Sequence, residues 1–204
     1  MDLYGNSVLL VIDVQNDFCP GGRLAVKDGD RVVPFINEIM DKFGKVVATQ
    51  DWHPEDHLSF ASNHPGKEVM EIETIDGIEQ VLWPDHCIQG TEGANFYPGL
   101  NIENISLILR KGMDKRIDSY SAFFENDKKT STGLDGYLRN LHIDTVYLTG
   151  LATDYCVYYT AIDAVKLGYR TNLFIKGSRG VNFPEGNVER AVNDMKERGV
   201  KIIE

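Results

Sequence analysis

The stretch that decides the fold is residues 145–168, which read "TVYLTGLATDYCVYYTAIDAVKLG". Its first part, 145–150, is a short apolar run of the kind found in strands that are covered on both faces. Its second part, 155–167, places small and branched apolar residues at helical spacing, and Gly168 is a natural helix stop. The stretch therefore predicts a buried strand followed directly by a helix.

The same alternation recurs along the chain. Further strands are predicted at 7–13, 45–51, 105–111, 170–176 and 200–203, and further helices at 30–43 and 185–198. Apolar strands that alternate with amphipathic segments form βαβ units. The predicted fold class is α/β: a three-layer, doubly wound, Rossmann-like, mainly parallel six-stranded sheet with helices on both faces.

The length of 204 residues favours a single domain over residues 1–204. One segment, about 52–100, breaks the alternation and is rich in His, Pro, Gly, Asn and Asp. A long irregular excursion inside a compact domain is usually functional. We therefore expect an irregular loop excursion that carries a metal site.

Charge and composition limit the partners. The formal net charge of −10 disfavours nucleic acid and anionic membranes, which need a basic surface, and favours a small-molecule substrate. No apolar run is long enough for a membrane span or a signal core. Three cysteines without CxxC spacing argue against a disulfide framework, so we expect a cytoplasmic protein. A homo-oligomer is left open.

Reactive groups stand at the ends of several predicted strands. Asp13, Asp51 and Lys111 each close a strand, and Cys156 falls in the first turn of the helix after another. Because the carboxyl ends of parallel strands meet at one edge of the sheet, these side chains are expected to lie together. A charged residue that ends a strand can simply mark where solvent begins. A set of four with a cysteine among them favours a site.

Cys156 has two interpretations. In the first turn of a helix capped by Thr153 or Asp154, the dipole and free N–H groups would lower the pKa of the thiol and could hold an oxyanion. Alternatively it is a small buried hydrophobe, which is our interpretation of Cys19 and Cys87. A nucleophilic thiol needs a base and a charge partner, and Asp13 and Lys111 could supply them.

A metal site is predicted in the excursion. Asp51 and His53 are two residues apart, so in an extended segment both point to one side, and His86 can add a third ligand. Such a set suits Zn²⁺ or Fe²⁺ and leaves positions open for water or substrate. His57 is left open as a ligand. His64 is expected at the surface and His142 at a helix end. Three aromatic residues lie near these candidates in the sequence and could stack on a flat ring: Phe18, Trp83 and Tyr120.

These residues lie in motifs that resemble a known family. The motifs are "VIDVQNDFCPGGRLAV", "TQDWHPEDHLSF", "WPDHCIQGTEGA", "LRKGMD" and "GLATDYCVYYTAIDA". Together they resemble the nicotinamidase (pyrazinamidase) branch of the isochorismatase-like cysteine hydrolase superfamily. The resemblance covers nearly the whole chain.

The resemblance implies hydrolysis of nicotinamide, and also of pyrazinamide, to the acid and ammonia in NAD salvage, through a thioester on cysteine. It implies a triad of Asp13, Lys111 and Cys156. It implies an oxyanion hole from the N–H groups of Ala152 and Cys156, with a cis peptide before Ala152. The metal, most often zinc with iron or manganese as alternatives, would be held by Asp51, His53 and His86, with His57 open as a fourth ligand. Phe18, Trp83 and Tyr120 would bind the ring.

Other functions are less consistent with these motifs. A sister hydrolase acting on a carbamoyl or ureido compound is not expected to carry the two metal-binding motifs, and the isochorismate branch lacks the cysteine. A non-catalytic binding module usually loses a catalytic residue. A dinucleotide-binding oxidoreductase needs GxGxxG after the first strand, whereas this chain has "VQNDFCPGGR" there.

Overall fold

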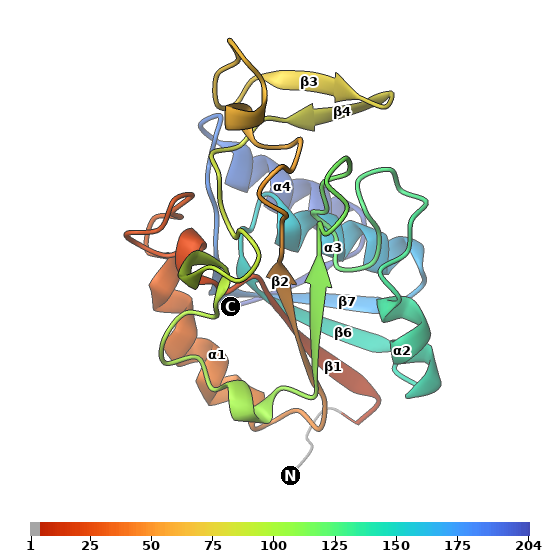
Figure 1. Ribbon diagram of the computed structural model, residues 1–204. Helices are drawn as coiled ribbons and strands as arrows, with labels where there is room; N and C mark the ends of the chain where they lie inside the picture. Colours follow the sequence, from red (N-terminus) through yellow and green to blue (C-terminus); the bar gives the residue numbers. More distant parts are fainter. Residues whose placement is uncertain (1–4) are drawn as a thin grey trace.

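The computed structural model describes residues 5–204 and contains a six-stranded sheet in which every neighbouring pair of strands is parallel. The strands lie in the order β5-β2-β1-β6-β7-β8 (Figure 1). Their bounds are β1 Ser7–Ile12, β2 Val46–Asp51, β5 Leu107–Lys111, β6 Thr145–Leu151, β7 Arg170–Arg179 and β8 Lys201–Ile203. The predicted strands and their parallel arrangement are confirmed, and β7 extends beyond the predicted end at 176.

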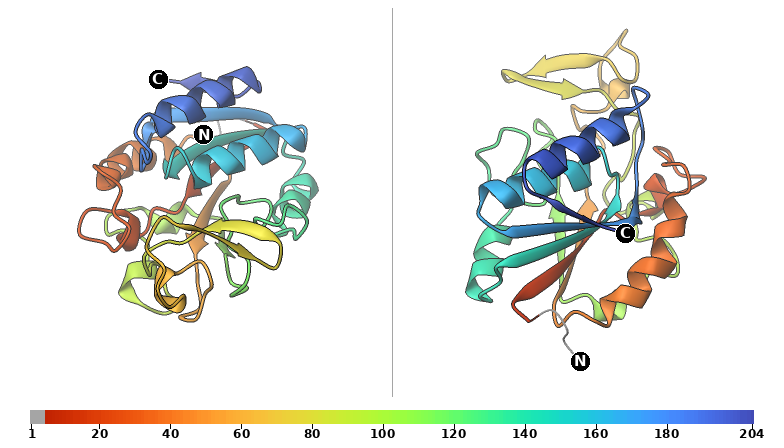
Figure 2. Two further views of the ribbon diagram at one scale, coloured as in Figure 1. Left: turned by 90° about the horizontal axis from the view of Figure 1, so that it is seen from above. Right: turned by 180° about the vertical axis from the view of Figure 1, so that it is seen from behind.

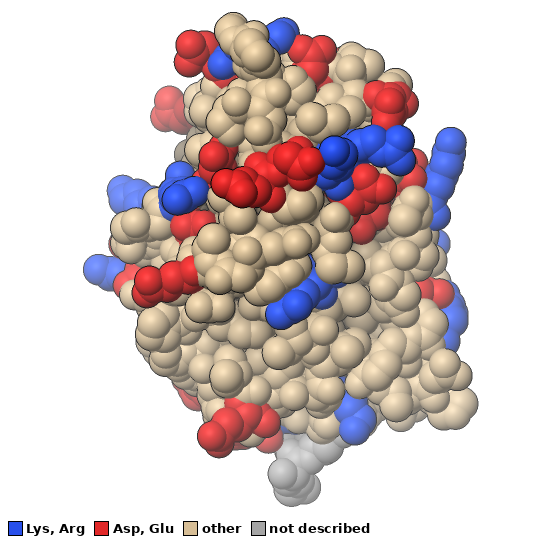
Figure 3. All heavy atoms as spheres, in the orientation of Figure 1, with Lys and Arg blue, Asp and Glu red and all other residues tan. Residues whose placement is uncertain are grey.

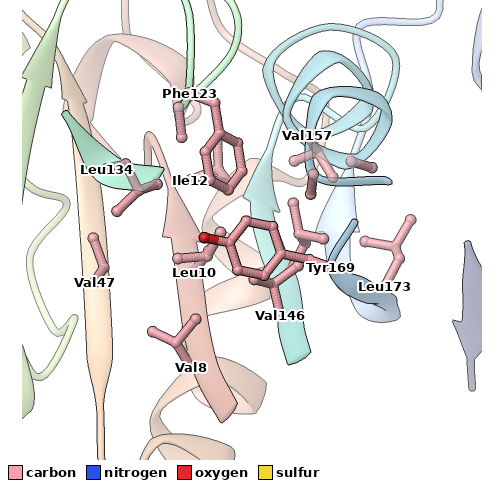
Figure 4. Packing of buried hydrophobic residues seen from close by; sticks show 14 of the residues in the cluster. Val8, Leu10, Ile12, Val47, Phe123, Leu134, Val146, Val157, Tyr169 and Leu173 are labelled. Atoms are coloured by element: carbon pink, nitrogen blue, oxygen red, sulfur yellow. The ribbon is translucent and has the colours of Figure 1, made fainter. Parts of the chain in front are cut away.

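The apolar run of β1 is buried along its whole length because both faces of the sheet are covered. Val8, Leu10 and Ile12 point into one core, drawn in Figure 4. Leu9 and Val11 point into the other core. Successive side chains of a strand alternate between faces, so a run without polar residues fits only a strand buried on both sides.

Within residues 5–204, four α-helices form the outer layers. α1 Val32–Met40 packs against one face, and α2 Leu134–Asn140, α3 Cys156–Lys166 and α4 Asn187–Glu197 pack against the other (Figure 2). This three-layer arrangement confirms the predicted fold class. The sequence did not predict α2, because this short helix buries only two side chains, too few for a recognisable period.

The segment predicted as an irregular excursion contains a β-hairpin, so that prediction is wrong for its middle part. β3 Ile72–Ile75 and β4 Ile78–Val81 pair antiparallel, and the hairpin lies beyond the carboxyl ends of β2 and β5 (Figure 1). Its turn residues Asp76 and Gly77 have φ values of 51° and 82°. Asp-Gly is a favoured pair for a tight turn that needs positive φ at both positions, and it was the available signal.

The rest of the excursion is fastened by isolated bridges, His53 to Ile88 and Phe60 to Trp83. Short 3₁₀ turns occur at Asn16–Phe18, Gly29–Arg31, Ala61–Asn63, Glu92–Ala94 and Ile102–Asn104.

On the face drawn in Figure 3, basic side chains lie among acidic ones. Within residues 5–204, none of the helices has both the length and the apolar character needed to cross a bilayer.

Candidate active site

Reactive side chains gather at the carboxyl edge of four neighbouring strands. Lys111 ends β5 and Asp51 ends β2, and the strand register pairs these two residues directly. Asp13 follows β1, and Cys156 begins α3 after the loop that leaves β6. Because β5, β2, β1 and β6 are adjacent in the sheet, the four side chains converge as the sequence analysis expected.

Lys111 lies at the centre of this group. Its buried Nζ lies 2.9 Å from Oδ2 of Asp13 and 3.5 Å from Sγ of Cys156. It also donates to Oδ1 of Asp51 and, at 2.6 Å, to the backbone carbonyl of Ser119. Burial alone would lower the pKa of Lys111, but the carboxylates of Asp13 and Asp51 hold it well above its usual value. The residue is therefore a permanent cation shared by the thiol and both carboxylates.

Asp13 is held in one orientation by Thr49. The Thr49 hydroxyl donates to Oδ1 of Asp13 at 2.5 Å and accepts the Asp13 backbone N–H at 3.1 Å. Burial raises the pKa of Asp13 to about 6, with Lys111 opposing that rise and Asp51 adding to it. At neutral pH the side chain is therefore mostly a carboxylate, with a pKa suited to exchanging a proton.

Cys156 keeps its proton in the resting protein. Burial raises the pKa of the thiol well above its usual value, and the attraction of Lys111 offsets only part of that effect. The expectation that the helix start lowers this pKa is therefore wrong for the resting state. The free energy needed to desolvate a fully buried thiolate is larger than the stabilisation that one helix dipole provides. A thiol beside a buried carboxylate can be activated by passing its proton to that carboxylate when a substrate arrives.

The loop before Cys156 is fixed by backbone contacts instead of a side-chain cap. The N–H groups of Tyr155 and Val157 both donate to the carbonyl of Ala152, at 3.0 and 3.1 Å. The peptide between Leu151 and Ala152 is cis, which confirms that prediction. The expected capping role of Thr153 or Asp154 is wrong: the residue before the helix is Tyr155, with no side-chain cap bond.

Thr153 and Asp154 instead form hydrogen bonds with other segments. The Asp154 carboxylate accepts the backbone N–H groups of Val181 and Asn182, at 2.9 and 2.8 Å. The Thr153 hydroxyl lies 2.7 Å from the hydroxyl of Ser178. Both contacts tie the loop before α3 to the end of β7 and to the segment that follows it.

A second centre adjoins the thiol through Asp51. Oδ2 of Asp51 lies 3.7 Å from Nε2 of His53 and 3.9 Å from Nε2 of His86. The three ligand atoms lie within 4.8 Å of one another, and all three side chains are buried. Nε2 of His53 has no hydrogen-bond partner among residues 5–204. One carboxylate and two imidazoles form an N/O donor set that fits a divalent ion such as Zn²⁺.

The charges of this set are also suited to a cation. Burial would raise the pKa of Asp51, but Lys111 and the two histidines keep it below its usual range, so it stays ionised. Burial lowers the pKa of His86. For His53, burial would also lower the pKa, but the neighbouring Asp51 raises it. A proton and a metal ion therefore compete for the His53 nitrogen.

His57 lies beside this set together with Asp118. The rings of His53 and His57 have centroids 4.5 Å apart. The ligand atoms of His53, His57 and Asp118 form a second group within 4.8 Å of one another, which shares only His53 with the first. Burial lowers the pKa of His57 to about 4, so this ring is neutral at pH 7.

One pocket joins the thiol to the candidate metal site. It is lined by Cys156, Ala152, Asp51 and His86 together with the predicted aromatic residues Phe18, Trp83 and Tyr120. Its space is about 370 Å³, counting the part that is open to solvent. The indole N–H of Trp83 donates to the hydroxyl of Tyr120 at 3.0 Å and so fixes both rings.

Four other residues of the pocket wall were not predicted from the sequence: Leu24, Asp118, Tyr155 and Val181. Tyr155 could have been found because it directly precedes Cys156. Asp118 could not, since the segment after Lys111 has no regular pattern.

Cys19, Cys87 and His142 lie where the sequence predicted them, whereas His64 is half-buried instead of fully exposed at the surface. Cys19 and Cys87 are buried free thiols. The half-buried His64 donates through Nε2 to the carbonyl of Leu58 at 2.7 Å. His142 is exposed just after α2.

The isochorismatase domain family matches residues 7–204, nearly the whole chain. The chain therefore belongs to this family. A nicotinamidase from Acinetobacter baylyi is 48% identical over 198 residues, which are 97% of this chain and 92% of the relative.

Solved structures agree with this assignment. The nicotinamidase/pyrazinamidase of Acinetobacter baumannii has a TM-score of 0.95 and 53% identity, covering 98% of this chain and 96% of that chain. Yeast nicotinamidase bound to the inhibitor nicotinaldehyde has a TM-score of 0.91 and 31% identity, covering 97% and 99%. Pyrazinamidase of Pyrococcus horikoshii in complex with zinc has a TM-score of 0.79 and 36% identity, covering 98% and 99%.

Proposed function

We propose that this protein hydrolyses nicotinamide to nicotinate and ammonia, and that it also accepts pyrazinamide. The observation that carries the proposal is the single pocket in which the Cys156 thiol, with Asp13 behind it, faces Asp51 and His86. The names of the relatives above agree with it. A flat, aromatic amide suits a pocket that has three ring side chains on its wall.

Asp13 is the base and Cys156 the nucleophile. Asp13 accepts the thiol proton, and the sulfur forms a bond to the carboxamide carbon. The carbonyl oxygen becomes an oxyanion, which the N–H groups of Ala152 and Cys156 stabilise. The C–N bond then breaks, Asp13 returns its proton to the leaving nitrogen, and ammonia departs from a thioester.

Water completes the reaction. Asp13 accepts a proton from the attacking water as its oxygen bonds to the thioester carbon. The C–S bond then breaks, Asp13 passes the proton to the sulfur, and the released nicotinic acid ionises to nicotinate. Through both halves Lys111 stays charged within 3.5 Å of the sulfur and 2.9 Å of Asp13. It stabilises the thiolate and keeps Asp13 ionised until the proton is transferred.

Asp51, His53 and His86 would hold a divalent metal ion. Zinc is the first candidate, because of the donor set and the zinc-bound relative, and Fe²⁺ and Mn²⁺ are alternatives. When bound, the ion supplies a Lewis acid that can anchor a ring nitrogen. The protein side chains then fix the rest of the substrate, with Phe18, Trp83 and Tyr120 around the ring.

The cellular role that fits this reaction is the return of nicotinamide to NAD synthesis, in the cytoplasm. The buried free cysteines agree with a reducing compartment. A homo-oligomer is compatible with this role.

The direct test measures both products from purified, zinc-loaded protein. We expect ammonia and nicotinate in equal amounts from nicotinamide, turnover of pyrazinamide, and little from carbamoyl or ureido compounds. Isochorismate should not be cleaved. Faster turnover of a ureido or carbamoyl substrate than of nicotinamide would replace the proposed function with that of a sister hydrolase.

A further inference from the structure

The histidines around the proposed metal site differ in which ring nitrogen carries hydrogen. Nδ1 of His53 lies 2.9 Å from the carbonyl oxygen of Gly112, and Nδ1 of His86 lies 2.8 Å from that of Pro84. A carbonyl oxygen only accepts, so each Nδ1 must donate a hydrogen. In the neutral ring Nε2 then carries the lone pair, and Nε2 is the atom that each ring turns toward Asp51.

His57 has the opposite arrangement. The backbone N–H of Ser59 donates to Nδ1 of His57 at 3.0 Å, and the Ser59 hydroxyl lies 2.7 Å from the same nitrogen. A backbone N–H can only donate, so Nδ1 of His57 must carry the lone pair. The hydrogen of the neutral ring is therefore on Nε2. A nitrogen that carries this hydrogen has no lone pair to give to a metal ion.

The surroundings of the His57 ring suit a donor. Nε2 is buried and has no hydrogen-bond partner within the described residues. Acceptors near the ring include the Asp118 carboxylate and the Ile117 carbonyl. Oδ1 of Asp118 accepts the Ser119 N–H at 2.7 Å and lies 3.9 Å from Nε2 of His53. The ligand atoms of His57 and Asp118 lie within 4.8 Å of each other, a separation that one bridging oxygen atom can span.

We propose that His57 is not a fourth ligand of the ion, and that His57 and Asp118 are positioning residues that hold an oxygen atom of solvent beside it. The protein then supplies three ligands: Asp51, His53 and His86. This inference rests on the proposed metal site, because a protein that binds no ion offers nothing for His57 to be placed against. The hydrogen bond from the Ser59 backbone N–H to Nδ1 excludes His57 as a ligand, whereas the neighbouring His53 accepts no such bond from any of residues 5–204 and stays a ligand.

Nitrogen NMR reads this difference directly. The chain has five histidines, so long-range ¹H–¹⁵N correlation spectra of the ¹⁵N-histidine, zinc-loaded protein are simple, and His57→Gln assigns its signals. We expect His57 to have hydrogen on Nε2 and a free lone pair on Nδ1. His53 and His86 should have hydrogen on Nδ1 and zinc on Nε2. A zinc-shifted Nε2 on His57 would overturn the inference.

Metal affinity gives a second measurement that needs no turnover. His86→Ala should abolish stoichiometric zinc binding, measured by competition with a chelator. His57→Gln and Asp118→Asn should weaken it by about 10- to 100-fold, as is usual for residues that support a ligand sphere without entering it. Exposed His142→Gln is the matched control and should change nothing. Loss in His57→Gln equal to that in His86→Ala would contradict the inference.

The outcomes separate the two proposals. Zinc bound through His53 and His86 alone, without turnover of any amide, would reject the proposed reaction and leave the role of His57 standing. Turnover of nicotinamide by a protein in which zinc binds three imidazoles would support the proposed reaction and reject the role of His57. Absence of bound zinc, iron or manganese in the wild-type protein would reject the metal site and the inference together.

Discussion

The Nζ atom of Lys111 lies 3.5 Å from the sulfur of Cys156. The same ammonium group contacts Asp13 and Asp51, so a single cation serves both the thiol and the carboxylate of the proposed metal site. Both centres are buried, where charges interact more strongly than in water. The two halves of the site are therefore electrostatically coupled, and a change at Lys111 should be felt in both.

Lys111→Met removes the charge and keeps much of the side-chain volume. Two buried carboxylates then lose their common cation, which should cost about 3–5 kcal/mol of unfolding free energy. Turnover should fall on the order of 10²–10³-fold, as when one preorganised charge is lost. Urea denaturation and steady-state assays check both values. Lys115→Met is the control, because its ion pair with Asp56 is exposed, and its denaturation midpoint should hardly move.

The pH dependence of turnover should follow Asp13. Its pKa is raised to about 6, and only the carboxylate can accept the thiol proton. As pH falls through about 6, Asp13 takes up a proton, and kcat/KM should fall by up to about tenfold per pH unit. Bound zinc must be measured at each pH, because protons also compete at His53. An unchanged kcat/KM at pH 5 with zinc still bound would exclude Asp13 as the base.

Cys156→Ala should reduce ammonia release to the level of a blank reaction and leave nicotinamide binding measurable by calorimetry. The reason is that the side chain supplies the atom that bonds to the substrate, while the aromatic side chains of the pocket, Phe18, Trp83 and Tyr120, are unchanged. In the wild-type protein, rapid acid quenching should trap a nicotinoyl adduct on Cys156, visible by mass spectrometry.

Cys19→Ala is the matched control, because Cys19 is a buried free thiol in the opposite core. It should retain turnover. Normal ammonia release by Cys156→Ala would remove covalent catalysis from the proposal.

Removal of the metal should stop turnover reversibly. Chelation followed by dialysis should leave folded protein without activity, and added Zn²⁺ or Fe²⁺ should restore it. Neither hydrophobic core includes Asp51, His53 or His86, so the circular dichroism spectrum should change little. Full activity after removal of all detectable metal would disprove the proposed role of the site.

The sheet and the residues on its edge could be predicted because a strand that is buried on both faces is apolar along its whole length, and this pattern is visible in the sequence. β1 has no polar residue between Val8 and Ile12, and Asp13 follows at once. The helix α2 has no recognisable hydrophobic pattern, since only Leu134 and Leu138 are buried in it. Local turn chemistry at Asp76 and Gly77 did indicate the hairpin but was overlooked within a polar segment.

The properties of the site were harder to predict than its members. The raised pKa of Cys156 comes from burial, which depends on the packing of segments far apart in the sequence. The same holds for Asp118, which the irregular segment after β5 brings to His53. The orientation of His57 is a local matter, a contact between residues two apart, but hydrogen bonds of this kind have no signature in composition or period.

Gly112→Ala should disturb the metal site without touching a proposed ligand. Gly112 has φ +64°, and an added Cβ would collide with the His53 ring at Cε1 and Nδ1. The Gly112 carbonyl also accepts the His53 Nδ1–H, so a shift of this backbone would turn the ring. We expect zinc affinity to fall by about 10- to 100-fold.

Gly90→Ala separates this effect from backbone strain. Gly90 has φ +76°, and its added Cβ would meet nothing within 4 Å. Both variants force alanine into the left-handed region, at a cost of about 1–2 kcal/mol in stability. Only Gly112→Ala should also lose zinc in a chelator competition. Equal zinc affinity in the two variants would show that the Gly112 carbonyl does not orient His53.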